Sequence, residues 1–130
     1  MVTPKELKYA KTHEWVRVEG ELAYVGITDY AQESLGDIVY LEPPEQGQAV
    51  KQGEEVATIE SVKAASPIYT PVSGTIERLN PLLEKKPELI NQKPYEAFLF
   101  VVRTSVPAEL AALLDASAYE SHVEQEKASH

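Results

Sequence analysis

The chain has 130 residues and carries a formal net charge of −9, with a pI near 4.8. This length predicts a single domain over residues 1–130. The acidic balance argues against nucleic acid and against an anionic membrane surface as partners, because both bind clustered lysine and arginine. Since the chain has no cysteine, it has no disulfide framework, no thiolate nucleophile and no cysteine-based metal site.

The N-terminal segment, residues 1–11, alternates charged residues with single apolar ones. It has neither the apolar core of a secretory signal nor the acid-poor composition of a transit peptide. No apolar run in the sequence reaches the length that is needed to span a bilayer. We therefore expect a cytoplasmic protein, or a mitochondrial matrix protein if a transit peptide has been removed.

The first two thirds of the chain are typical of short β-strands. Residues 14–19 alternate polar and apolar side chains, and residues 22–27 run back after the turn at Gly20, which predicts a hairpin. A short helix is expected over residues 30–35, with Thr28 or Asp29 as its cap and Gly36 at its end. Further strands are expected at residues 37–42, 56–60, 68–70 and 75–79.

The last third changes from strands to helices. A helical turn is expected from Asn80 to Leu83, an irregular loop over residues 84–97, and a buried strand over residues 98–102. Helices are expected from Pro107 onward and over residues 117–126. The order predicts a mainly β protein, a small barrel or sandwich with short helices, whose core spans about residues 7–104 and whose C-terminal helical tail spans about residues 106–127.

The sequence offers no catalytic constellation and no metal-ligand motif. It lacks a nucleophile elbow, a phosphate loop and a dinucleotide fingerprint. The three histidines, His13, His122 and His130, lie far apart without a metal-binding spacing. We expect His122 and His130 to be solvated in the polar tail, and His13 to have a structural or surface role.

One lysine stands out by its setting. Lys63 falls at the turn between two apolar strand runs and is followed by the small residues Ala64 and Ala65. Such a tip exposes the amine to a modifying enzyme, and an attached cofactor could supply the chemistry that the chain lacks. The alternative is an unmodified hairpin lysine whose charge only makes the turn soluble.

The pentapeptide Glu60-Ser61-Val62-Lys63-Ala64 resembles the lipoylation motif of the glycine cleavage system H proteins. The similarity continues in the order of that family through nearly the whole chain, at Thr12-His13-Glu14-Trp15-Val16, residues 26–32 and 35–40, Pro71-Val72-Ser73-Gly74, residues 87–91, Pro94-Tyr95 and Leu113-Leu114-Asp115. The resemblance implies a barrel-sandwich hybrid of the lipoyl/biotinyl-domain type. It also implies that Lys63 forms an amide with lipoic acid.

The resemblance further implies a carrier that is not itself catalytic. Its lipoyl arm would take an aminomethyl group from a glycine decarboxylase (P protein) and deliver it to an aminomethyltransferase (T protein). A dihydrolipoyl dehydrogenase (L protein) would then reoxidise the arm. A lipoate ligase or a lipoyl/octanoyl transferase would attach the cofactor.

The same resemblance gives roles to three other residues. Glu60 matches an acidic residue that helps the lipoylating enzyme to recognise the turn, and the alternative is an exposed charge at a strand end. Glu14 matches a position near the loaded arm, where a carboxylate would pair with the aminomethyl ammonium. Thr12 would add a hydrogen bond there.

Two departures from the family pattern bear on this reading. Pro67 stands where members commonly carry an acid, and the Gly-Trp pair that often follows Pro-Tyr is missing, with Phe98 as the replacement core residue. These departures keep open an alternative, a related protein that relays lipoyl groups to other acceptors. A biotin carrier is disfavoured because Lys63 is not flanked by methionines, and an unmodified adaptor remains a further alternative.

Overall fold

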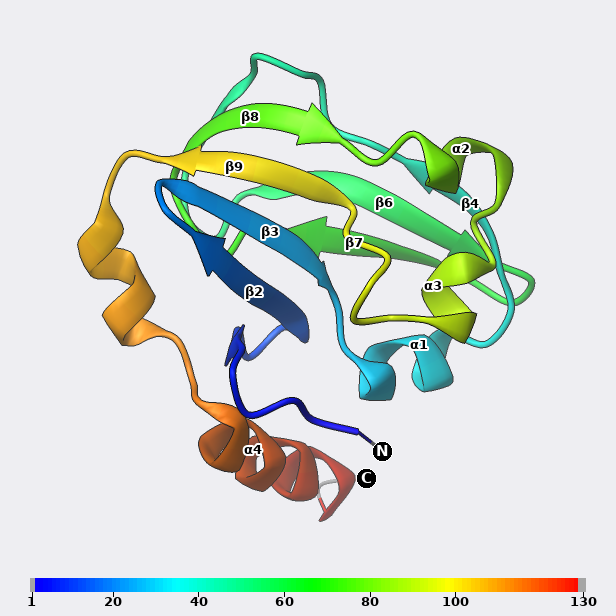
Figure 1. The fold of residues 1–130 in the computed structure, drawn as a ribbon. Helices are drawn as coiled ribbons and strands as arrows, with labels where there is room; N and C mark the ends of the chain where they lie inside the picture. The colour runs from blue at the N-terminus through cyan, green and yellow to red at the C-terminus, as the bar shows by residue number, and fades with distance from the viewer. Residues whose placement is uncertain (1, 129–130) are drawn as a thin grey trace.

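The computed structural model describes residues 2–128 and shows two antiparallel sheets that pack against each other without closing into a barrel (Figure 1). The larger sheet has the strand order β1-β2-β3-β9-β8-β5, with bounds Lys8–Tyr9, Glu14–Glu19, Leu22–Ile27, Phe100–Thr104, Gly74–Leu79 and Ala49–Val50. The smaller sheet has the order β4-β6-β7, with bounds Ile38–Glu42, Glu55–Ser61 and Ala65–Tyr69. The predicted mainly β fold is confirmed.

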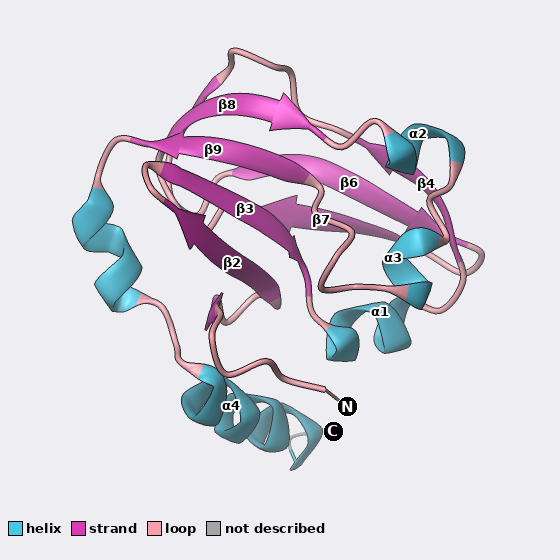
Figure 2. Cartoon of the chain, in the orientation of Figure 1, coloured by secondary structure: helices cyan, strands magenta, loops and turns pink. Residues whose placement is uncertain are grey.

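Short helices lie at the ends of the sheets, and a longer one forms the tail (Figure 2). The helices are α1 Asp29–Leu35, α2 Leu82–Lys85, α3 Leu89–Gln92, the 3-10 helix Pro107–Ala112 and α4 Ala116–Ala128. The α1 helix has the predicted ends. The Thr28 hydroxyl accepts a hydrogen bond from the Ala31 amide at 3.2 Å, and Gly36 ends the helix with φ of 79°.

Three expectations about the last third were wrong in detail. Residues 84–97 are not an irregular loop throughout, because α3 forms there. Its Asn91 side chain accepts from the Ile38 amide at 2.9 Å and donates to the Gly36 carbonyl at 2.8 Å. The last strand begins at Phe100 rather than at residue 98. The helix at Pro107 is a 3-10 helix that ends at Ala112, because the chain then extends so that Leu114 can exchange backbone hydrogen bonds with Tyr9.

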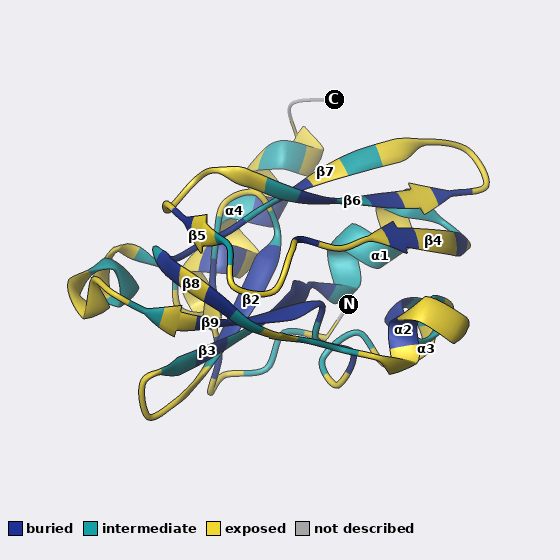
Figure 3. Cartoon of the chain, turned by 90° about the horizontal axis from the view of Figure 1, so that it is seen from above, coloured by how far each residue is buried: buried dark blue, intermediate teal, exposed yellow. Residues whose placement is uncertain are grey.

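The main core fills the space between the two sheets (Figure 3). Strands of both sheets contribute fully buried apolar side chains to it, as the alternation of the predicted strands requires. Its members include Val16, Val25, Ile27, Ile59, Ile68, Ile76, Phe100 and Val102.

A second apolar cluster joins the tail helix to the outer face of the larger sheet. It contains Leu7, Tyr9, Trp15, Ala116, Tyr119 and Val123. The Tyr9 and Tyr119 rings stack with centroids 4.7 Å apart, and Phe98 packs partly buried at the margin of the cluster, edge to face with Tyr24 at 5.2 Å. Among residues 2–128, no helix is long and apolar enough to cross a membrane.

The contact between Trp15 and Gly26 yields a stability prediction. The two residues pair across β2 and β3, and a Cβ on residue 26 would lie 2.5 Å from the Trp15 indole carbons. We expect Gly26→Ala to lower the free energy of unfolding by about 3 kcal/mol through overpacking, as measured by urea unfolding. In the control variant Gly20→Ala, the added Cβ has no atom within 4 Å, and the only penalty comes from the φ of +63° at this position. Its free energy of unfolding should therefore fall by about 1 kcal/mol. Equal losses in the two variants would contradict the overpacking argument.

Candidate functional site

Lys63 lies at the tip of the tight turn that joins β6 to β7. Ser61 closes this turn. Its amide donates to the Ala64 carbonyl at 2.8 Å, and its hydroxyl accepts from the Ala64 amide at 3.2 Å. Side chains of serine stabilise turns in this way. Lys63 and its neighbours Val62 and Ala64 are exposed, so the turn presents the lysine to solvent.

The Lys63 side chain has no hydrogen bond or ion pair within residues 2–128. Its stem passes over the end of α1, where a Cβ on Gly36 would lie 3.7 Å from the lysine Cε. The Val62 amide donates to the Asp37 carbonyl at 3.0 Å, which ties the turn to the segment that follows α1. The backbone of the turn is therefore fixed, while the amine has no partner in the described part of the chain.

A shallow groove of about 160 Å³ lies between α1 and β7, and we call it the arm groove. Lys63 is not part of its lining, but Leu35, which precedes Gly36, and Ser66, which follows the Lys63 turn, are, and we call this the near end of the groove. Thr12 and His13 form its far end. The full lining is Thr12, His13, Ile27, Tyr30, Ala31, Ser34, Leu35, Ser66, Pro67 and Ile68.

Glu14 is a buried carboxyl behind the far end of the arm groove. Its side chain is 1% exposed. One oxygen accepts a hydrogen bond from the Thr12 hydroxyl, and the other accepts from the Tyr69 amide of β7 at 3.2 Å. Desolvation raises the pKa of Glu14 to about 7, and the two hydrogen bonds oppose this rise. Glu14 thus links the two sheets. With a pKa of about 7, its carboxyl changes between the neutral and the ionised form near neutral pH.

Thr12 separates Glu14 from open solvent. It lines the arm groove and also a second cavity of about 300 Å³, which is bounded by Tyr69 and by the chain before α4. Since Thr12 is exposed while Glu14 is not, a ligand in either cavity meets Thr12 first.

Two further residues from the sequence lie on the same surface. Glu60 is the penultimate residue of β6, next to the turn, and pairs with Ala65 and Tyr40 of the flanking strands. Its side chain is exposed. Pro67 lies on the arm-groove wall in β7, an edge strand of the smaller sheet, where a residue without an amide hydrogen is tolerated.

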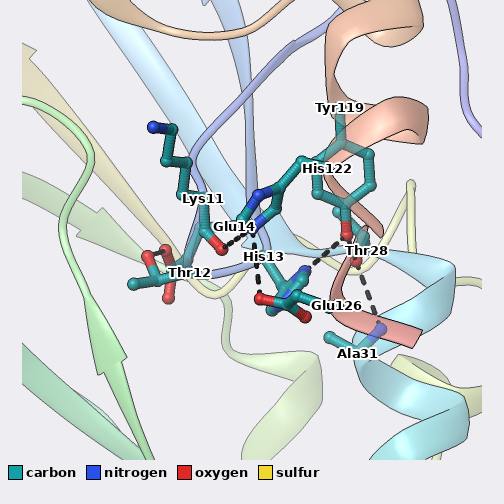
Figure 4. Close-up of polar contacts among 9 residues, drawn as sticks. All are labelled: Lys11, Thr12, His13, Glu14, Thr28, Ala31, Tyr119, His122 and Glu126. Atoms are coloured by element: carbon teal, nitrogen blue, oxygen red, sulfur yellow. Dashed lines mark hydrogen bonds and ion pairs between the residues drawn. The ribbon is translucent and has the colours of Figure 1, made fainter. Parts of the chain in front are cut away.

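The expectation that His122 is solvated was wrong. In the fold, His122 contacts His13 and Glu126, and its Nε2 lies 3.0 Å from the Lys11 carbonyl (Figure 4). The only signal in the sequence was the spacing of His122 and Glu126 by one helical turn, because Lys11 and His13 are more than a hundred residues away. His130 lies outside the described residues.

The raised pKa of Glu14 has a measurable effect on stability. The folded protein keeps this proton up to about pH 7, whereas the unfolded chain loses it near the ordinary value of 4.5. The folded state therefore binds more protons between these values, and stability falls as pH rises through this window. Relative to Glu14→Gln, which keeps the hydrogen-bonding shape, we expect the wild type to lose up to about 3 kcal/mol between pH 4.5 and pH 8.

Urea unfolding at both pH values measures this difference. Glu33→Gln, which changes an exposed glutamate on α1, is the matched control and should follow the wild type. If the wild type and Glu14→Gln had parallel pH profiles, Glu14 would not hold its proton in the folded state.

The comparisons with known proteins agree with this geometry. Residues 7–126 match the family model described as Glycine cleavage H-protein. The chain is 55% identical over 124 residues to the glycine cleavage system H protein of Serratia proteamaculans, covering 94% of this chain and 97% of that protein. For the Thermus thermophilus H protein the identity is 52% over 127 residues, with coverages of 97% and 99%.

A solved structure supports the same assignment. The crystal structure of a glycine cleavage system H protein from Mycobacterium marinum superposes with a TM-score of 0.85 at 33% sequence identity, covering 93% of this chain and 98% of that one. This neighbour confirms the predicted lipoyl-domain-like fold. The chain therefore belongs to the glycine cleavage H-protein family.

Proposed function

We propose that this protein is a lipoyl-bearing carrier of the glycine cleavage system and that Lys63 is the residue that carries the lipoyl group. The observation that carries the proposal is the position of Lys63 at the exposed tip of a tight turn that Ser61 closes, inside the Glu60-Ser61-Val62-Lys63-Ala64 motif. The turn holds the backbone while the side chain extends into solvent, where a modifying enzyme can reach the amine.

The surroundings of Lys63 suit such an attachment. Exposed Ala64 and Ala65 leave space on one side of the amine, and the largely apolar arm groove begins on the other side. An amide with the lysine would remove its positive charge and add a long apolar chain, which the groove could bury. When bound, the lipoyl group supplies a disulfide that the cysteine-free chain lacks, and with it the means to carry a one-carbon group and electrons.

Glu14 and Thr12 have a protective role in this proposal. A cargo derived from glycine bears an amine, which is an ammonium near neutral pH. A cation next to the Glu14 carboxyl favours its ionised form, and the resulting charged hydrogen bond is strong in a buried site. Thr12 controls access to that carboxyl, and the burial of Glu14 would keep water away from the cargo.

Glu60 is assigned to recognition by the enzyme that attaches the lipoyl group. It lies beside the turn with its side chain exposed, and within residues 2–128 that side chain makes no hydrogen bond or ion pair that would give it a structural role. A lipoate ligase or a lipoyl/octanoyl transferase would read this charge. The P, T and L proteins are the proposed partners of the loaded carrier, in the cytoplasm, and the carrier itself is proposed to be non-catalytic.

The attachment site is tested by Lys63→Arg. Intact mass of protein from lipoate-supplied cells should show a lipoyl increment for the wild type and none for the variant, because the arginine guanidinium does not form the amide. Lys51→Arg changes another exposed lysine and should keep the increment. An unmodified wild type, or a modified Lys63→Arg protein, would exclude Lys63 as the site.

The carrier role is tested separately by reconstitution. The lipoylated wild type should support glycine decarboxylation with the P, T and L proteins. Position 67 on the arm-groove wall is a proline and not an acid. This departure favours a second candidate function, in which the protein relays lipoyl groups to other acceptors. Full lipoylation without glycine decarboxylation would favour that second function.

The protective role of Glu14 is tested by the lifetime of the loaded carrier. Glu14→Gln should be lipoylated normally but should lose labelled cargo to water at least about tenfold faster than the wild type, since one charged hydrogen bond is removed. Glu33→Gln should retain the wild-type lifetime. An unchanged lifetime in Glu14→Gln would remove Glu14 from the mechanism while leaving the Lys63 assignment intact.

A further inference from the structure

Three potential metal ligands from distant parts of the chain meet beneath the tail helix. His13 lies in the turn before β2, and His122 and Glu126 lie one turn apart on α4. The His13 Nε2 is 2.8 Å from one Glu126 oxygen, and the His122 Nε2 is 3.1 Å from the other. All three ligand atoms lie within 4.8 Å of one another. Both imidazoles thus direct their Nε2 atoms toward the same carboxylate (Figure 4).

The orientation of the His13 ring is fixed by a second set of contacts. Its Nδ1 is 2.8 Å from the Tyr119 hydroxyl, which is 2.6 Å from the Thr28 hydroxyl. Tyr119 and Thr28 are both fully buried. Metal-binding histidines are commonly held in this way, through the ring nitrogen that does not bind the metal. The Tyr119 contact orients the ring so that the Nε2 atom of His13 faces the cluster. A metal at this nitrogen would displace the proton that it shares with Glu126.

We propose that His13, His122 and Glu126 form a binding site for a divalent zinc ion. Two imidazole nitrogens and one carboxylate oxygen are a three-ligand set that zinc accepts, with a fourth position left for water. Tetrahedral binding at zinc–nitrogen distances of about 2.0–2.1 Å requires the two Nε2 atoms to lie roughly 3.3 Å apart. Rotation of the His122 side chain would bring its Nε2 toward the Nε2 of His13. This rotation breaks the contact between His122 and the Lys11 carbonyl.

The burial of the three side chains suits an ion that enters from solvent. Their exposed fractions are 17% for His13, 21% for His122 and 35% for Glu126. Lys11 offers the cluster its backbone carbonyl, and its ammonium group points away (Figure 4). The ligands are therefore accessible but already held near one another, so little ordering is needed on binding.

Zinc at this place would fasten the tail helix to the segment that leads into β2. His13 lines the arm groove and stands between Thr12 and Glu14. The site would therefore stiffen the far end of the groove without using a residue that is assigned to lipoyl attachment. Nothing in the proposed carrier function requires it, so the two proposals can fail independently.

The test is a zinc titration of the full, unlipoylated chain after metal removal, with a competing chelator to set the free zinc concentration. The wild type should bind one zinc ion per chain. His122→Gln and Glu126→Gln should each weaken binding at least about tenfold, a loss that removal of an outer partner alone can cause. Glu124→Gln, which removes an exposed acid of α4 outside the cluster, is the matched control and should bind as the wild type does.

Two further measurements show whether a variant binds zinc weakly because it lacks a ligand or because it is not folded. The metal-free variants should keep the wild-type circular dichroism spectrum, and zinc should raise the melting temperature of the wild type but not of His122→Gln. In NMR spectra, zinc should shift the imidazole signals of His13 and His122. Absence of stoichiometric binding, or equal affinity in wild type and His122→Gln, overturns the proposal.

Discussion

The burial of both faces of the first half of β2, at Glu14, Trp15 and Val16, is the constraint on which the site depends. Successive side chains of a strand point to opposite faces, and Trp15 occupies the outer face, where its indole fills the space above Gly26 and donates to the Pro94 carbonyl at 2.9 Å. Glu14 and Val16 must then point inward. Val16 joins the main core, whereas Glu14 reaches the edge strand β7 and satisfies the Tyr69 amide. A carboxyl is thereby buried between two sheets because its neighbour is a tryptophan.

Much of the fold follows from local chemistry and could be predicted. The hairpin of β2 and β3, the α1 helix between Thr28 and Gly36, and the turn at Lys63 rest on side chains that bond within a few residues of their own position. The sequence motifs likewise placed the chain in its family. In these segments the local preference and the tertiary structure agree, which is the condition under which reasoning from sequence works.

The features that could not be predicted depend on contacts between distant residues. The α3 helix exists in a proline-bearing segment because Asn91 bonds the chain around Gly36 and Ile38. The meeting of His13 with His122 depends on the docking of α4 by Tyr9 and Tyr119. The motif located Glu14, but its near-complete burial, and hence its pKa near 7, follows from the packing of both sheets.

In the proposed carrier, Pro67 offers no carboxylate to an ammonium cargo, so the proposed ionic contact depends on Glu14. A carboxylate that is always ionised would hold a cation but would have to be solvated or paired at all other times. A buried carboxyl with a pKa of about 7 is instead neutral for much of the time and ionises when a cation arrives, because a nearby positive charge favours the charged form. Binding of an ammonium would then release a proton from Glu14. In the proposed carrier, the free-energy cost of burying the charge on Glu14 would therefore be met only while the cation is present.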